Sequence, residues 1–321
     1  MVRIIADSTC DLSDEILSKY NIGIAPLTIN ISSKEYKDRI DISPNEFYSM
    51  MENFENEPTT SMPDPYEYIR LFEESKESGY NEILCICMSS GTSGAYQSAV
   101  IAKREYVSNH NDELEIYVVD SKSMSHGSGY LIMKSMELLE SGATFKELID
   151  FNEMYKTNVK HLLAVDDLNH LLRSGRLSNA SAMIGKILRL KPIMSMRNGK
   201  GAIVAKERGR KRVFNYYIRE YINRVDERIT DFIIIGYTSD INIANNLKRL
   251  LLNETGFNGK VYIMQMGVSV GTHVGLGAVS MYFIEKDHIK TGLMKSELEK
   301  ILYNKDIFLK KIKELKNQKT S

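Results

Sequence analysis

Residues 82–99 read EILCICMSSGTSGAYQSA, a short apolar run followed by a stretch rich in hydroxyls and glycine and then by a helical pattern. The run Glu82–Met88 is typical of a strand that is buried on both faces. The stretch Ser89–Ala99 follows it directly, and open α/β sheets bind their ligands at the carboxyl ends of strands. Because a helix N-terminus offers unpaired N–H groups and glycine admits a ligand to the backbone, this stretch predicts an anion site.

The kind of anion is limited by what this loop lacks. It has no lysine of the GxxxxGK[ST] type, and no GxGxxG follows a strand elsewhere, so a nucleoside triphosphate or a dinucleotide is poorly supported. A simpler alternative stays open, in which the serines and glycines only form a turn that caps the helix.

Similar alternation of short apolar runs and helical patterns extends outward from this stretch and predicts an α/β fold with two domains. We expect an N-terminal three-layer α/β/α domain with a parallel sheet over residues 1–160. A C-terminal two-layer α/β domain with a mixed sheet is expected over residues 161–285, and an amphipathic helical tail over residues 286–321. The predicted strands are Arg3–Asp7, Ile22–Asn30, Glu82–Met88, Glu115–Asp120, His161–Val165, Ile193–Met196, Ala202–Lys206, Phe232–Tyr237, Lys260–Met266 and Ala278–Ile284.

Helix starts and one hairpin are marked clearly. Ser43, Asp64 and Thr144 each precede a helical pattern with a glutamate three residues later, which predicts capping boxes. Residues 197–201, RNGKG, separate two strand patterns and predict a hairpin turn.

Composition excludes several classes of protein. The 321 residues hold 42 Lys+Arg and 42 Asp+Glu, so no net field attracts nucleic acid, and no nucleic acid partner is expected. The three cysteines lack CxxC spacing, which fits a reducing cytoplasm and supplies no zinc site. No apolar run reaches the ~18 residues of a membrane span, and no signal peptide precedes the first strand. We therefore expect a cytoplasmic protein without a transmembrane segment, although transient membrane contact stays open.

Three further polar stretches are candidates for a site. Residues 59–65, TTSMPDP, contain a hydroxyl cluster that could bind a ligand. The alternative is that this segment only forms a turn and caps the following helix. Arg173 and Arg176 flank a glycine and could clamp a carboxylate or phosphate, or tie the two domains together through carboxylates. His273 lies in the glycine-dense stretch Gly267–Ala278, which we interpret as a loop before a strand. A histidine in such a loop is more often functional than a lone histidine elsewhere.

A catalytic alternative rests on Ser93. The segment 91–95, GTSGA, approaches the GxSxG nucleophile elbow but has Ala95 where glycine is needed. Ser93, His273 and Asp120 could form a triad of a serine hydrolase, but a triad is defined by geometry. No histidines pair at metal-binding spacing, so no metal centre is predicted.

Seven segments, in their order along the chain, resemble the DegV family of fatty-acid-binding proteins. They are Asp7–Leu12 (DSTCDL), Thr60–Pro63 (TSMP), Ser89–Ala99, Val119–Ser123 (VDSKS), Asp167–Ser178 (DLNHLLRSGRLS), Lys191–Ile193 (KPI) and His273–Ala278 (HVGLGA). Departures from the family pattern occur at Met62, Thr92, Ser174 and Leu276, and none removes a hydroxyl, arginine or histidine expected at the ligand. The tail 286–321 has no counterpart in the pattern.

The resemblance implies one long-chain fatty acid, such as palmitate, bound between the two domains. Its carboxylate would bond to Thr60 and Ser93, with His273 nearby. Supporting contacts are expected from Ser61, Thr92, Gly94, Arg173 and Arg176. The bound acid would be presented to a separate ATP-using fatty acid kinase, so the resemblance implies a carrier without a cofactor or catalytic activity of its own.

The energetics suit such a carrier. A sixteen-carbon chain buries about fifteen methylene and methyl groups at ~0.8 kcal/mol each, a gross gain of roughly 12 kcal/mol that is offset by chain ordering. The head-group contacts then mainly set position. Sixteen methionines could supply a compliant pocket wall, although most are ordinary core residues.

A third hypothesis is that the protein is regulatory and senses lipid through its tail helix or a basic surface. The run 206–212 carries Lys206, Arg208, Arg210, Lys211 and Arg212. We expect Arg208 and Arg210 to be a docking face for the kinase, the alternative being a solvated strand end.

Overall fold

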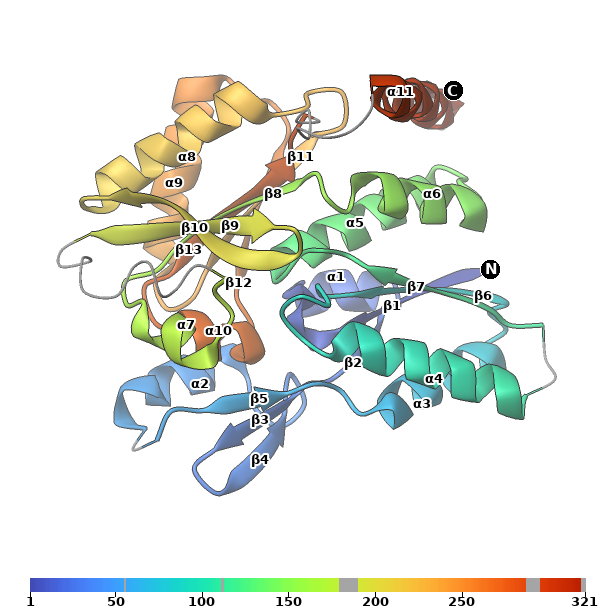
Figure 1. Ribbon diagram of the computed structural model, residues 1–321, viewed down its shortest axis with the longest axis horizontal. Helices are drawn as coiled ribbons and strands as arrows, with labels where there is room; N and C mark the ends of the chain where they lie inside the picture. Colours follow the sequence, from blue (N-terminus) through green and yellow to red (C-terminus); the bar gives the residue numbers. More distant parts are fainter. Residues whose placement is uncertain (55, 111–112, 179–189, 287–294, 319–321) are drawn as a thin grey trace.

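A parallel sheet with helices on both faces forms the N-terminal lobe (Figure 1). The computed structural model describes residues 1–54, 56–110, 113–178, 190–286 and 295–318. In spatial order the strands are β2 (Gly23–Ala25), β1 (Val2–Asp7), β6 (Glu82–Cys87) and β7 (Glu115–Asp120), all parallel. The helices that pack on this sheet are α1 (Asp14–Lys19), α3 (Pro65–Glu77), α4 (Ala95–Asn109), α5 (His126–Glu140) and α6 (Phe145–Tyr155).

Alternate residues of these strands are buried against opposite helical layers, as successive side chains of a strand require. Ile83 and Cys85 pack with the residues of α3 and α4, whereas Leu84 and Ile86 pack with those of α5 and α6. This double burial explains the uninterrupted apolar run of β6, and the predicted three-layer arrangement is confirmed.

A second, small sheet was not predicted. It is antiparallel and consists of β4 (Lys34–Lys37), β3 (Thr28–Ile31) and β5 (Thr59–Ser61). The prediction of one strand over Ile22–Asn30 is therefore wrong: β2 ends at Ala25 and β3 begins at Thr28. Pro26 lies between them, and proline has no N–H to continue a ladder, so the chain leaves the parallel sheet there.

The C-terminal lobe contains the predicted mixed sheet. Its spatial order is β10 (Lys200–Glu207), β9 (Lys191–Arg197), β8 (Val159–Ala164), β13 (Val279–Ile284), β11 (Phe232–Tyr237) and β12 (Lys260–Gln265). Among the described strands of this sheet, β11 and β12 alone pair in parallel. Strands β9 and β10 form the hairpin expected at residues 197–201. Helices α8 (Arg210–Arg224) and α9 (Ile241–Thr255) cover one face, and α5 packs on part of the other.

Helix ends agree with the capping signals at two of three sites. α2 (Pro44–Met50) and α6 have the capping boxes of Ser43 and Thr144. Asp64 caps α3, but Glu67 forms ion pairs with Lys37 and Arg70 instead of completing a box. Short 3-10 turns occur at Ser8–Cys10 and Met51–Asn53.

The glycine-dense stretch Gly267–Ala278 is not a loop, which corrects the prediction. Residues Val268–Val274 form helix α10, which packs near α7 (Asn169–Ser174) and α2. Tertiary packing outweighs the poor helix propensity of its glycine and β-branched residues. Gly271 is required there, since a Cβ would lie 2.4 Å from the Tyr48 hydroxyl. This helix carries His273 to the junction of the lobes.

Helix α11 (Lys295–Gln318) is the described part of the predicted amphipathic tail. It packs on the N-terminal lobe: Ile312 is buried, and the Phe308 ring stacks with that of Phe151 at 6.2 Å. Lys305 Nζ donates to Asn158 Oδ1 over 3.1 Å. Residues 287–294 and the side chains of Leu298, Ile301 and Leu302 lie outside the described residues. The domain limits at 160 and 285 stay predictions.

Candidate functional site

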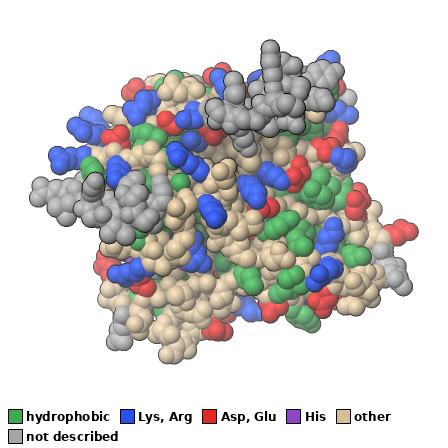
Figure 2. Space-filling view, in the orientation of Figure 1, with side chains coloured by type: hydrophobic (Ala, Val, Ile, Leu, Met, Phe, Trp, Pro, Cys, Tyr) green, Lys and Arg blue, Asp and Glu red, His purple; other side chains and the backbone are tan. Residues whose placement is uncertain are grey.

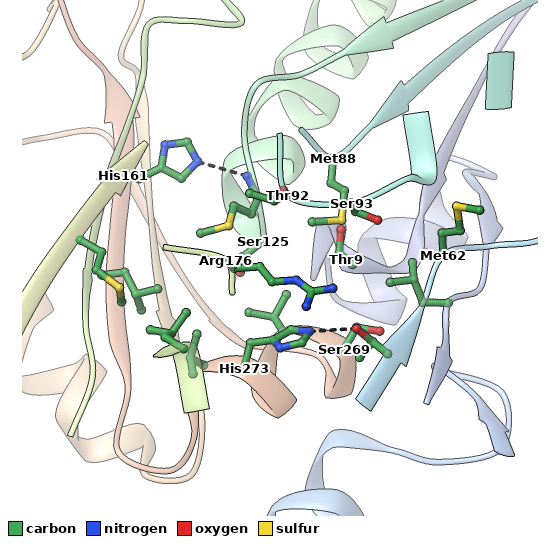
Figure 3. Close-up of a pocket in the computed structure, with 18 of the residues that line it drawn as sticks. Thr9, Met62, Met88, Thr92, Ser93, Ser125, His161, Arg176, Ser269 and His273 are labelled. Atoms are coloured by element: carbon green, nitrogen blue, oxygen red, sulfur yellow. Dashed lines mark hydrogen bonds between the residues drawn. The ribbon is translucent and has the colours of Figure 1, made fainter. Parts of the chain in front are cut away.

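A pocket of about 200 Å³ lies at the junction of the two lobes (Figure 3). The N-terminal lobe contributes residues from β5, from the β6–α4 loop and from the start of α5, and the C-terminal lobe contributes residues from β8, β9, β13 and α10. The pocket is lined by Thr9, Leu27, Thr60, Met62, Met88, Thr92, Ser93, Gly94, Met124, Ser125, His161, Leu163, Leu171, Arg176, Met194, Ser195, Ser269, Val270, His273, Val274 and Tyr282.

The β6–α4 loop supplies Thr92, Ser93 and Gly94 to this pocket. Ser93 Oγ accepts a hydrogen bond from the N–H of Ala95, the first residue of α4, at 3.2 Å. The loop is fixed to the other lobe, because Ser89 Oγ donates to the carbonyl of Gly199 in the β9–β10 turn at 2.6 Å. The loop that was predicted to bind an anion therefore lines the pocket and also contacts the C-terminal lobe.

We predict that Gly91→Ala destabilises the chain by about 1–3 kcal/mol, the usual cost of overpacking. A Cβ at Gly91 would lie 2.3 Å from the carbonyl oxygen of Gly199, which is backbone and cannot rotate away. Urea unfolding measures the change, with Ser89→Ala as the comparison variant that removes the hydrogen bonds of the Ser89 hydroxyl to Gly199 and Gly91 without adding a Cβ. An unchanged unfolding midpoint for Gly91→Ala would mean that the two loops are not held together.

Thr60 and His273, which are 213 residues apart in sequence, meet at the pocket. Thr60 Oγ1 and His273 Nε2 are 2.9 Å apart. Burial lowers the pKa of His273 to about 4, and the nearby Arg176 adds to this effect, so the imidazole is neutral at pH 7. The pocket therefore offers an uncharged imidazole and hydroxyls from β5 and the β6–α4 loop.

The two candidate arginines have different surroundings. Arg176 is half-buried and lines the pocket, and its guanidinium also donates to the carbonyl of Ser174. Arg173 instead forms an ion pair with Glu57, and its side chain is 63% exposed. Ser61 is exposed and is not among the lining residues. The structure thus brings Arg176 to the pocket and places Arg173 and Ser61 away from it.

Buried carboxyl groups behind the pocket were missed as site residues. Asp11 Oδ2 accepts from Ser125 Oγ at 2.5 Å and Asp11 Oδ1 from the N–H of Gly267 at 2.9 Å. Asp38 Oδ2 accepts from Ser269 Oγ at 2.6 Å. The bonds to Gly267 and Ser269 join the N-terminal lobe to the segment that begins α10. Burial raises the pKa of Asp11 to about 8 and also raises that of Asp38. The two aspartates of the stretch Asp7–Leu12 were the sequence signal that could have indicated a buried carboxyl group near the site.

The hydrolase triad is not assembled. Asp120 accepts hydrogen bonds from Ser90 and Lys122, His273 contacts Thr60, and the Ser93 hydroxyl contacts the backbone of Ala95. The serine hydrolase reading is therefore not favoured. Among the described residues, no group of three His, Cys, Asp or Glu side chains is placed to hold a metal ion.

The predicted docking arginines lie on the C-terminal lobe. Figure 2 shows Lys and Arg side chains gathered over the corner of β10 and α8, at the upper left of that view. Arg208 is exposed there. Arg210 donates to the carbonyl of Gly277 at 2.9 Å and pairs with Asp166, so it also holds its own lobe together. In the described part of the chain, no helix is long and apolar enough to span a bilayer.

The two α/β lobes and the mainly apolar pocket between them define a ligand-binding protein of the type built around an interlobe cavity. A model of the DegV family, described as "Uncharacterised protein, DegV family", matches residues 1–286, and the chain belongs to this family. A DegV domain-containing protein of Caldanaerobacter subterraneus is 32% identical over 287 residues, which cover 89% of this chain and 99% of the relative.

Two solved structures share the fold. A DegV family protein from Thermus thermophilus, described by its fatty acid binding, is 25% identical with a TM-score of 0.80. DegV from Bacillus subtilis, described as a fatty acid binding protein, is 28% identical with a TM-score of 0.77. Each alignment covers 89% of this chain and 99% of the other. Helix α11 lies beyond the residues that the family model matches.

Proposed function

We propose that this chain binds one long-chain fatty acid in the interlobe pocket and acts as a carrier rather than as an enzyme. The observation that carries the proposal is the pocket itself, which combines neutral donors at one side with an apolar, methionine-rich wall. The fatty acid binding of the relatives from Thermus thermophilus and Bacillus subtilis supports it.

In this proposal the carboxylate binds to Thr60 and Ser93 beside His273, with Thr92, Gly94 and Arg176 near it. Met62 lines this side of the pocket and is 52% exposed, so the pocket opens to solvent there. Figure 3 shows Met62 and Ser93 on the same side. A head group at this side would be accessible from outside while the acyl chain is covered.

The wall along the acyl chain would adapt through Met62, Met88, Met124 and Met194. Methionine is unbranched and fills irregular space, so its rotamers can change with the ligand. The volume of about 200 Å³ is below the ~300–1,000 Å³ of typical ligand sites, and rotation of these side chains would supply the added length.

We further propose that a separate, ATP-dependent fatty acid kinase phosphorylates the accessible carboxylate. The β6–α4 loop has no phosphate-loop lysine, which fits a chain that leaves nucleotide binding to a partner. In this proposal the carboxylate bonds to the neutral hydroxyls of Thr60 and Ser93, and its accessible oxygen is available for transfer. The proposed setting is the cytoplasm, where ATP is present. The lipid-sensing alternative is not favoured, because α11 packs on its own lobe.

We predict that Arg208→Glu lowers the kinase-coupled rate severalfold at low ionic strength, because rim charges mainly alter association. The effect should shrink at high salt. Initial rates at two salt concentrations measure it. Arg210→Glu is unsuitable, since it would also break the pair with Asp166. A rate unaffected by Arg208→Glu at both salt concentrations would remove this residue from the docking face.

Organic-solvent extraction of the purified full-length chain, followed by mass spectrometry, tests the proposed function. We expect one predominant long-chain fatty acid in roughly equimolar amount. A lipid-free preparation that also fails to bind palmitate or oleate would contradict the proposal.

A further inference from the structure

A second cavity, of about 550 Å³, also lies at the junction of the two lobes, and we call it the far cavity. The N-terminal lobe lines it with the β7–α5 loop and the end of α6. The C-terminal lobe lines it with β8, β9 and its turn, and the end of β13. Ser195 lines both the far cavity and the interlobe pocket, so the two cavities are neighbours.

The far cavity continues the wall of the interlobe pocket along two strands. On β8, His161 lines the pocket and Val159 lines the far cavity, and on β9 the corresponding residues are Met194 and Met196. Residues two apart on a strand face the same side, and the register of β8 with β9 places all four side chains on one face of the sheet. His161 lies across the pocket from Met62 (Figure 3), and Val159 is about 7 Å further along β8. The far cavity therefore lies beyond the inner end of the pocket.

Methionine side chains lie where the two cavities adjoin. Met124 and Met194 line the inner part of the pocket, and Met196 lines the far cavity. Methionine is unbranched and fills irregular space, so rotation of these side chains would join the two cavities. The pocket alone is smaller than the ~300–1,000 Å³ of typical ligand sites, whereas the two cavities together fall within that range.

The outer edge of the far cavity is cationic. Arg197 and Lys286 are exposed there, and neither forms an ion pair with another residue that the structure describes. Glu285 also lines the cavity, but its carboxylate is already paired with Lys160 and Arg224. Two cations at this edge are thus available to an anionic group of a ligand.

Two further lysines of the lining do not add to this charge. Lys122 Nζ lies 2.5 Å from a carboxylate oxygen of Asp120, and Lys156 is paired with Glu153. Each pair is neutral overall. The positive charge that a ligand meets in the far cavity therefore comes from Arg197 and Lys286.

We propose that the interlobe pocket and the far cavity together bind a long-chain α,ω-dicarboxylic acid. One carboxylate lies beside Thr60 and Ser93, and the other lies at Arg197 and Lys286. The inference rests on the proposed fatty acid binding and extends its ligand class. The methyl end of a fatty acid gains nothing from a cationic edge, whereas a second carboxylate finds there the planar donor fork of a guanidinium and an ammonium group. The order of the lining, with neutral donors, then an apolar wall and then cations, matches a molecule with an apolar middle and an acid group at each end.

Calorimetric titration of the delipidated full-length chain with α,ω-dicarboxylic acids of about 14 to 22 carbons, each beside the monocarboxylic acid of the same length, tests this inference. At one length we expect the diacid to bind at least as tightly as the monoacid and up to about fivefold more tightly, the scale of an exposed charge pair. If the pocket ended in an apolar wall, the second carboxylate would be buried without a partner and every diacid would bind far more weakly. This comparison uses the unaltered chain and depends on no variant.

Arg197→Gln combined with Lys286→Gln removes both charges at the outer edge. It should weaken binding of that diacid about fivefold and change palmitate affinity by less than twofold, because palmitate has no second carboxylate. Arg104→Gln combined with Arg212→Gln is the matched control, since these two arginines are exposed and line neither cavity. It should leave both affinities unchanged.

Two results would overturn the inference while the proposed function stands. In the first, monoacids bind and every diacid binds more weakly than the monoacid of its length. In the second, diacid affinity is the same in the folded Arg197→Gln, Lys286→Gln variant as in the original chain. If neither monoacids nor diacids bind, the proposed function fails, and this inference with it.

Discussion

Replacing Thr60 by valine is expected to lower the rate of acyl phosphate formation by about 100-fold, while fatty acid binding weakens by only about 1 kcal/mol. The valine keeps the shape of the side chain but removes the hydroxyl that meets His273 Nε2 at 2.9 Å. One lost hydrogen bond has a net cost of that size, whereas a small displacement of a reacting group can cost 10²-fold in rate. Ser93→Ala should follow the same pattern. Titration with palmitate and the kinase-coupled rate measure the two effects.

Thr59→Val is the matched control, because Thr59 is the exposed neighbour on the same strand β5. It should leave both quantities within about twofold of the original chain. Equal and small losses of affinity and rate in Thr60→Val would show that Thr60 does not position the carboxylate.

Between about pH 7.5 and 8.5 the free energy of unfolding is expected to fall as the pH rises, by roughly 0.5–1 kcal/mol per pH unit. Burial raises the pKa of Asp11 to about 8, against an ordinary value of 3.8. In this window the folded chain still partly holds the proton that the unfolded chain has lost. Because the folded state binds more protons, its stability falls with rising pH at up to ~1.4 kcal/mol per unit. Burial also raises the pKa of Asp7 and Asp38, which act in the same direction.

Buried histidines have the opposite effect but in a different window. Burial lowers the pKa of His126 to about 3 and that of His161 and His273 to about 4. Their contribution to stability is present above the ordinary histidine pKa of 6.5 and is lost as the pH falls toward 4. The unfolded histidines become neutral only about one pH unit above 6.5, so the carboxyl groups set the slope from about pH 7.5 upward.

Urea unfolding at pH 7.5, 8.0 and 8.5 measures this slope. Asp11→Asn should flatten it, whereas Glu77→Gln, which removes an exposed carboxylate, should leave it unchanged. A slope that is the same in Asp11→Asn and in the original chain would show that this carboxyl group is ionised in the folded state.

The parts of the fold that the sequence predicts best are the doubly buried strands. The predicted limits of Phe232–Tyr237 and Glu115–Asp120 are those of β11 and β7, because an apolar run between polar residues leaves little choice of boundary. The prediction was wrong over Ile22–Asn30 and Gly267–Ala278. Pro26 was a local signal for the end of the first strand that the prediction did not use. The contact of Gly271 with Tyr48, which supports a helix, is a tertiary effect without a local signal.

The site could be predicted only in part. The resemblance pointed to Thr60, Ser93 and His273, and the structure places all three in one pocket, but no spacing rule connects residues 213 apart. Strand alternation alone could have separated Thr60 from Ser61, since neighbours on a strand face opposite sides. The bonds of Asp11 to Ser125 and Gly267 could not be foreseen, because burial and partners are set by the whole fold.

Native mass spectrometry of palmitate binding to the delipidated full-length chain tests the central claim most directly. The stoichiometry is compared between the original chain and Thr92→Trp. Thr92 lines the pocket from a half-buried position, so tryptophan there fills the space in which the acid would lie. We expect one palmitate per original chain and none in a Thr92→Trp variant whose circular dichroism shows that it is folded. Failure of the original chain to bind palmitate, or equal binding by both, would contradict a fatty acid site between the lobes.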